Sequence, residues 1–263
     1  MKTQIILTTA MLAASSANAA LVTLYSQDFD SLPSANTTVA NTGAINAQGE
    51  VTQLASASFT NATWYAARIA GSSTSAMPFQ ANNGSGNTGG LQSYAATSST
   101  DRWLGLFASG TSTPAVGLAL VNTTGYTLTS VTISFTAGQW RSPNGSGAVV
   151  NTVNFAYGFS SNPSITSSNF LSSSAMTADA SGNLVSGSPT STPVTGLSDV
   201  SAKTVTLSNV VWAANATLFI RWQDVDNAGA DAGLGINNLT IVPAPGAAAL
   251  IGAASLLTSR RRK

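Results

Sequence analysis

The sequence predicts an all-β fold, an antiparallel β-sandwich for which we favour the jelly-roll type. In segments 131–136, 153–159 and 217–222, apolar residues alternate with polar ones, which is the period of a strand with one buried face. Clusters of Gly, Ser, Thr and Asn separate the short apolar segments, and no stretch has a convincing amphipathic-helix pattern. Short strands joined by turns are typical of antiparallel sandwiches.

Further strands are expected on the same grounds. In chain order they are segments 21–29, 103–108, 115–121, 148–150 leading into 153–159, 203–207 and 234–241. Segments 72–75, 81–90 and 172–193 are rich in small polar residues and are predicted to be long loops. A Gly/Ser linker between two domains is the alternative, but neither flank carries a complete set of strands. We therefore expect one domain over residues 20–241, long enough for a single large core.

The N-terminus has the three parts of a secretory signal peptide. Lys2 is followed by an apolar stretch from Ile5 to Ala14 and by the small-residue site Ala17-Asn18-Ala19. The sequence therefore predicts a signal peptide over residues 1–19, removed by signal peptidase after Ala19 or one residue later. A first transmembrane helix is the alternative, which the short apolar stretch disfavours.

The C-terminus carries three elements in a fixed order. They are Val242, Pro243, Ala244, Pro245 and Gly246, then an apolar run over 247–257, then Arg260, Arg261, Arg262 and Lys263. Because proline lacks an N–H and fixes its φ, the folded domain is expected to end near Ile241. An uncharged run closed by cations is the pattern of a short hydrophobic helix that inserts while its basic end stays cytoplasmic. As a helix, residues 242–259 would cover about 27 Å, just short of the roughly 30 Å hydrocarbon core.

This ending resembles the PEP-CTERM sorting signal of bacterial exported proteins. Val242, Pro243 and Pro245 match its Val-Pro-Glu-Pro-like motif, the basic cluster matches its Arg-rich end, and Ala244 stands where the common pattern has Glu. The resemblance implies recognition by an exosortase-type membrane enzyme, transient anchoring in the inner membrane, and delivery to the cell surface or extracellular matrix. An ordinary C-terminal membrane anchor without processing is the alternative.

A second resemblance concerns the domain itself. Residues 28–32, 122–125, 139–141 and 233–241 look like segments of exported bacterial jelly-roll domains that carry this tail. They are also similar to the first and last strands of lectin-like domains and carbohydrate-binding modules. The resemblance implies a jelly roll, and it implies contact with sugars less strongly.

The charge and the missing residue types exclude several functions. Residues 20–241 hold five basic and nine acidic residues, a net charge of −4, so the domain offers nucleic acid no basic surface. Without cysteine there are no disulfides and no thiolate chemistry. Without histidine the usual general base and the Ser-His and Cys-His nucleophile pairs are missing. Most hydrolase mechanisms are therefore excluded, and we expect no enzyme.

Acidic residues form the strongest candidate site. Six residues are candidate metal ligands: Asp224, Asp226 and Asp231 in one loop, Asn237 in the last strand, and Asp28 and Asp30 near the first. The first and last strands of a sandwich can be neighbours, which would bring these oxygen atoms together. Calcium accepts six to eight such oxygen ligands, so a structural Ca²⁺ is one explanation. Turn formation and capping of backbone groups by Asp and Asn is the other, and the sequence leaves both open.

Two functions remain. A secreted hydrolase that acts on polysaccharide needs two carboxyl groups across a cleft, and Asp224 with Asp226 is the available pair. The favoured function is a non-catalytic surface or matrix protein that contacts extracellular polysaccharide or surface glycans. For that contact we expect an exposed Trp140 beside Arg141, because a turn over 142–145 follows them, whereas Trp103 and Trp222 are expected in the core.

Overall fold

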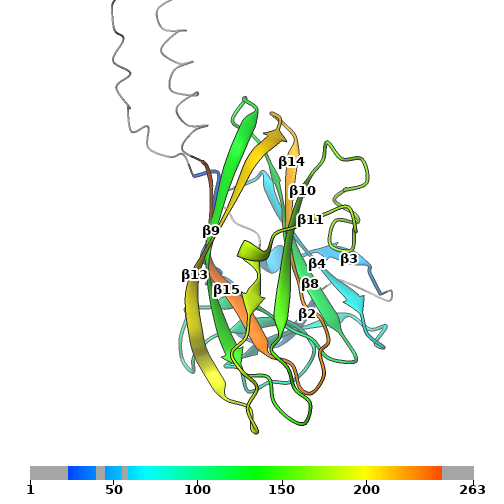
Figure 1. The fold of residues 1–263 in the computed structure, drawn as a ribbon, viewed down its shortest axis with the longest axis vertical. Helices are drawn as coiled ribbons and strands as arrows, with labels where there is room; N and C mark the ends of the chain where they lie inside the picture. The colour runs from blue at the N-terminus through cyan, green and yellow to red at the C-terminus, as the bar shows by residue number, and fades with distance from the viewer. Residues whose placement is uncertain (1–22, 40–44, 55–58, 245–263) are drawn as a thin grey trace, which may run out of the picture.

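Two β-sheets face each other across one hydrophobic core (Figure 1). The computed structural model describes residues 23–39, 45–54 and 59–244. All strand pairs are antiparallel except one, in which β5 and β6 run parallel. The predicted β-sandwich is thus confirmed.

The larger sheet, here called sheet A, has seven strands in line and an eighth beside them. Its order is β13 (Thr195–Trp212), β9 (Leu128–Arg141), β15 (Gly233–Pro243), β7 (Trp103–Phe107), β6 (Gly90–Tyr94), β5 (Met77–Asn82) and β2 (Thr37–Val39). The eighth strand, β1 (Tyr25–Gln27), pairs with β15. It lies on the same side of β15 as β7, farther along the strand.

The smaller sheet is called sheet B. Its order is β11 (Thr177–Ala178), β10 (Thr152–Phe159), β14 (Thr217–Gln223), β8 (Thr113–Val121), β4 (Ala62–Ala70) and β3 (Gln48–Glu50), with β12 (Leu184–Val185) also paired to β10. Two short 3₁₀ turns complete the elements, η1 (Thr52–Leu54) and η2 (Ala180–Gly182).

The strands whose sequence alternates most clearly are those that the structure confirms best. Segments 131–136, 153–159 and 217–222 all lie inside strands β9, β10 and β14. Segment 203–207 is only the middle of the much longer β13, and segment 148–150 is not a strand. The loop predicted over 81–90 begins two residues later in the structure, because β5 continues to Asn82.

Trp222 is fully buried in the core between the two sheets. The alternation Leu218, Ile220, Trp222 turns these three side chains of β14 toward sheet A, and all are buried. The ring of Trp222 stacks on Trp64 of β4, with centroids 6.5 Å apart. It also packs edge-on against Phe135 of β9 at 5.3 Å, which confirms that Trp222 belongs to the core.

A long segment covers the outer face of sheet B. Residues 160–176 place Ile165, Phe170, Leu171 and Met176 over the alanines and Phe219 of that face. Arg221, which alternation turns outward on β14, donates to the carbonyl oxygens of Phe170, Leu171 and Ser173 at 2.9–3.1 Å. In a chain without cysteine, this guanidinium holds the segment onto the sheet.

The last strand extends past the expected end of the domain. Val242 and Pro243 pair with Thr132 and Val131 of β9, and the N–H of Ala244 donates to the carbonyl of Ser130 at 3.1 Å. The prolines therefore end the strand two residues later than predicted, because Pro243 occupies its last position. Residues 1–22 and 245–263, with the predicted signal peptide and the rest of the predicted tail, lie outside the described residues. None of the helices in the described part is long and apolar enough to span a bilayer.

Candidate functional site

Hydroxyl groups line the outer face of sheet A where β13, β9, β15 and β1 meet. The register places Thr204 opposite Ser134, Ser134 opposite Thr240, and Thr240 opposite Ser26, so that four hydroxyl side chains form one row across four strands. Their neighbours along each strand, such as Val205 and Ile133, point into the core. Adjacent strands lie about 4.8 Å apart, so the row repeats at about that spacing.

Further hydroxyl residues flank this row. We call the whole set the hydroxyl face, and it consists of Ser26, Ser130, Thr132, Ser134, Thr204, Thr206, Ser208 and Thr240. Thr206 lies opposite Thr132, and Ser208 lies opposite Ser130. All eight side chains are exposed or half-buried. The eight residues are uncharged, and their hydroxyls are hydrogen-bond donors and acceptors.

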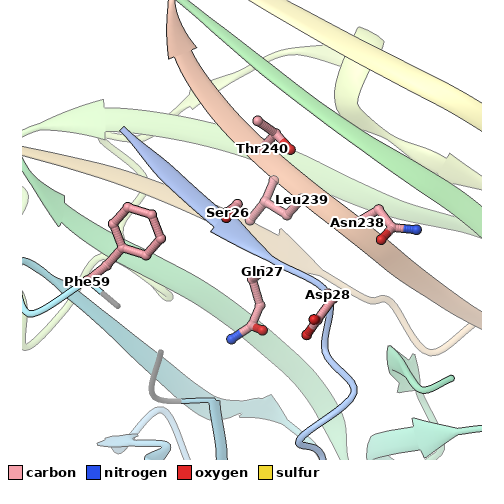
Figure 2. A pocket seen from close by; sticks show the side chains of 7 residues that line it. All are labelled: Ser26, Gln27, Asp28, Phe59, Asn238, Leu239 and Thr240. Atoms are coloured by element: carbon pink, nitrogen blue, oxygen red, sulfur yellow. The ribbon is translucent and has the colours of Figure 1, made fainter. Parts of the chain in front are cut away.

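A shallow depression of about 280 Å³ lies at the β1 end of the hydroxyl face (Figure 2). It is lined by Ser26, Gln27, Asp28, Phe59, Asn238, Leu239 and Thr240. Asn238 has a φ of 51°, and the register of β15 shifts between Asn237 and Thr240, so a bulge exposes the Asn238 amide beside Asp28. Bulges occur preferentially where a strand re-aims a side chain at a binding site.

The depression has the chemistry of a binding site for a polar, uncharged ligand. It offers hydroxyl and amide groups, the single carboxylate of Asp28 and the half-buried ring of Phe59, which packs on Tyr25 at 5.2 Å. With one carboxylate it has no acid pair for glycoside hydrolysis.

The six predicted metal ligands do not come together. Because β1 pairs with residues 239–241 of β15, Asp28 lies beside the far half of that strand. Asp231 precedes the first residue of β15, so about six strand residues, roughly 20 Å, separate the two groups. Among the described residues, no three His, Cys, Asp or Glu side chains are grouped so that they can hold a metal ion. The predicted convergence of all six residues on one site is therefore wrong, whereas the structural Ca²⁺ itself stays a prediction.

Asp28, Asp30 and Asn237 instead form hydrogen bonds with other groups of the chain. Asp28 Oδ1 accepts from the N–H of Asp30 at 3.2 Å, and Asp30 Oδ1 accepts from the N–H of Arg102 at 3.1 Å. Asn237 Nδ2 donates to Asp101 Oδ1 at 2.8 Å. The contacts of Asp28 and Asp30 bond backbone N–H groups, as in the turn and capping alternative that the sequence offered, whereas the contact of Asn237 joins two side chains.

The loop carboxylates are buried rather than exposed. Asp224 is 1% exposed and its Oδ1 accepts from the N–H of Val225 at 2.8 Å. Burial raises the pKa of Asp224 to about 8, with a smaller contribution from the charges of Asp231 and Asp226. Burial also raises the pKa of Asp231, which hydrogen-bonds Asp226. A buried Asp224 cannot flank a substrate cleft with Asp226, so the hydrolase alternative loses its acid pair.

The expected exposure of Trp140 and Arg141 is also wrong. Trp140 is 2% exposed and Arg141 is 8% exposed. The Trp140 ring stacks on Tyr94 at 5.5 Å and packs edge-on against Trp103 at 6.1 Å. A loop covers the pair: Arg141 Nη1 donates to the carbonyls of Gly84 and Ser85, at 3.3 and 3.2 Å. Trp140 and Arg141 are therefore closed to a glycan, and the expected burial of Trp103 is confirmed.

Sequence reasoning missed the hydroxyl face. Its signal was the polar half of the alternation in 130–136 and 202–208, where nearly every outward residue is Ser or Thr. By itself that pattern predicts only a strand with one buried face. The alignment of β13, β9, β15 and β1 was needed to see that the hydroxyls form rows.

The comparisons with known proteins give distant likenesses only. No family model and no curated protein matches the sequence. The K1 cleaved adhesin domain of Lys-gingipain from Porphyromonas gingivalis W83 has a TM-score of 0.32 at 12% identity, covering 82% of this chain and 96% of that one. The K3 cleaved adhesin domain of the same protein has a TM-score of 0.31 at 13% identity, covering 54% of this chain and 73% of that one.

A third likeness is to TmCBM61, solved in complex with β-1,4-galactotriose. Its TM-score is 0.26 at 7% identity, covering 54% of this chain and 70% of that one. At such low identities and TM-scores, none of the three structures supports an argument about what this chain binds or does.

Proposed function

We propose that this chain is a non-catalytic protein of the cell surface or extracellular matrix that binds extracellular polysaccharide through the hydroxyl face. The observation that carries the proposal is the row Thr204, Ser134, Thr240 and Ser26, which leads into the depression beside Asp28. A polysaccharide is a repeating array of hydroxyl groups, and a flat row of hydroxyls on a rigid sheet can bond several sugar units at once.

The energetics of such a face favour an extended ligand over a small one. A single neutral hydrogen bond contributes only about 1 kcal/mol net, because each partner gives up water. Useful affinity therefore needs several contacts along one polymer, which the strands hold in fixed positions at little cost in entropy. A face without charge also leaves binding nearly independent of salt concentration.

Polysaccharide binding can be tested by co-sedimentation of the chain with the polysaccharide that its source cell secretes. Replacing Thr240→Val and Ser134→Ala removes two hydroxyls of the row while keeping size and strand propensity. We expect the pair to weaken binding by about tenfold or more, at about 1 kcal/mol for each lost hydrogen bond. Thr63→Val, on the half-buried outer side of β4 in sheet B, is the matched control and should leave binding unchanged.

The same experiment separates this proposal from the calcium-dependent one. Since no three His, Cys, Asp or Glu side chains of the described residues are placed to hold a metal ion, we expect binding to persist when calcium is chelated. If the double variant and the parent chain bound polysaccharide equally well, the hydroxyl face would not be the glycan-binding surface.

Export and sorting form the second part of the proposal. The signal peptide over 1–19 and the tail over 242–263 support passage through signal peptidase, transient anchoring in the inner membrane, and processing by an exosortase-type enzyme. Because Val242, Pro243 and the N–H of Ala244 are bonded to β9, a cut after Ala244 would leave β15 whole. We expect the exported chain to begin at residue 20 or 21 and to end close after Ala244, which a measurement of its intact mass would show. A mass that retains residues 247–263 would instead favour a permanent anchor.

A further inference from the structure

Strand β13 is the long free edge of the sandwich. It has 18 residues and stands first in sheet A, paired only with β9. The other sheet ends are β2 and β3 with three residues each and β11 with two. Figure 1 shows β13, in yellow, along the outer margin of the molecule. A free edge presents unpaired N–H and C=O groups that can pair with another strand.

The turn η2 lies beside β13, but among the described residues β9 is the only strand that pairs with it. No backbone hydrogen bond from a turn or loop of that part of the chain reaches residues 195–212. The strand contains no proline. Three large apolar side chains in or beside its first half are exposed: Val194 at 53%, Leu197 at 42% and Val200 at 54%. Apolar side chains exposed along a free edge would be partly covered by a strand that paired there.

Three register shifts interrupt the pairing of β13 with β9 and leave one long regular stretch. Residues 201–208 pair one to one with residues 137–130 of β9, and the register shifts on both sides of that stretch. Asp199 and Asn209, next to these two shifts, have φ values of 49° and 56°. Pairing of this edge with the same edge of a second copy is closed, because it occupies both edges and so cannot grow into a filament.

The charges of the strand suit a second copy of itself. Asp199 and Lys203 are its only charged residues, and they lie symmetrically about Ser201. When two copies run antiparallel with a two-fold axis near Ser201 and Ala202, Asp199 of each copy comes within reach of Lys203 of the other. A single like-charged pair would oppose the contact, whereas this arrangement gives two opposite-charge pairs.

We propose that the free edge of β13 pairs antiparallel with the same edge of a second copy, joining the two A sheets into one continuous sheet. The two-fold axis lies near Ser201 and Ala202. As a consequence that rests on the proposed glycan binding, the two hydroxyl faces become one surface, so a polymer can contact both copies and gain affinity through multivalency.

Site-specific crosslinking tests the pairing directly, because the chain has no cysteine of its own. The full chain is kept in mild detergent, without polysaccharide, and carries Ala202→Cys. A short thiol-reactive crosslinker should convert most of it to dimer, since the two side chains lie close to the axis. Ser208→Cys is equally exposed on the same strand but about 40 Å from its mate across the axis, so it should stay monomeric.

Charge reversal tests the register. Asp199→Lys alone, or Lys203→Asp alone, creates like-charge pairs and should weaken dimerisation roughly tenfold. The double reversal Asp199→Lys with Lys203→Asp should restore dimerisation. If either residue only stabilised the fold of its own chain, the double reversal would not restore dimerisation. Equal crosslinking at 202 and 208, or a double reversal as weak as the singles, would overturn the proposal. The crosslinking experiment contains no glycan, so its result does not depend on whether the chain binds polysaccharide.

Discussion

Trp222→Ala is expected to lower the free energy of unfolding by about 3–5 kcal/mol. The side chain is fully buried between the sheets and contacts Trp64, Phe135 and Phe155 with ring centroids 5.3–6.5 Å apart. Removing it takes away the packing against Phe135 of sheet A and against Trp64 and Phe155 of sheet B, and it leaves a cavity that the surrounding rings can fill only partly. Against a typical total stability of about 5–15 kcal/mol, this is a large fraction.

Chemical denaturation of the variants measures this loss. Trp222→Phe keeps an aromatic ring in the same place and should cost clearly less than Trp222→Ala. Val211→Ala, at a side chain 66% exposed on β13, is the control and should change stability by less than about 0.5 kcal/mol. A loss below about 1 kcal/mol for Trp222→Ala would mean that Trp222 does not hold the two sheets together.

What the sequence predicted well is what depends on local alternation. The inward side chains of β9, β10 and β14 follow a strict period of two, and the burial of Trp222 follows from that period alone. Strand β6, an interior strand of sheet A, was not predicted, because its sequence lacks that alternation. All five of its residues are buried, on one face by the core and on the other by the Tyr94 cluster, so its sequence does not alternate.

What could not be predicted depends on contacts between distant segments. Trp140 ends a strand before a turn, a place that is exposed in most sheets. It is buried because the loop containing Gly84 and Ser85, more than fifty residues earlier, is bonded to Arg141. The predicted convergence of the acidic residues was wrong because it depended on the register of β1 against β15. Alternation shows which residues face inward, but it does not show which residues of two strands lie opposite each other.

The unfolding free energy is expected to fall as the pH rises from about 4 to about 8. Burial raises the pKa of Asp224 to about 8 and raises that of Asp231 as well, whereas both groups in the unfolded chain ionise near pH 4. Between these values the native protein keeps protons that the unfolded chain has released. Each such group then lowers stability by at most about 1.4 kcal/mol per pH unit. Most soluble proteins lose stability in acid, so this domain should show the opposite trend over that range.

Denaturation curves at several pH values, with a calcium chelator present, measure the slope. Asp224→Asn is the matched variant, because the amide oxygen can still accept from the N–H of Val225 while the titrating proton is gone. Its stability should depend less on pH than that of the parent chain. The charged groups that face Asp224 are Asp226 and Asp231, both acidic, so no cation offsets its burial. Repeating the series with calcium should give the same slope, whereas a stability that rises with pH only in calcium would mean that these carboxylates bind the ion after all.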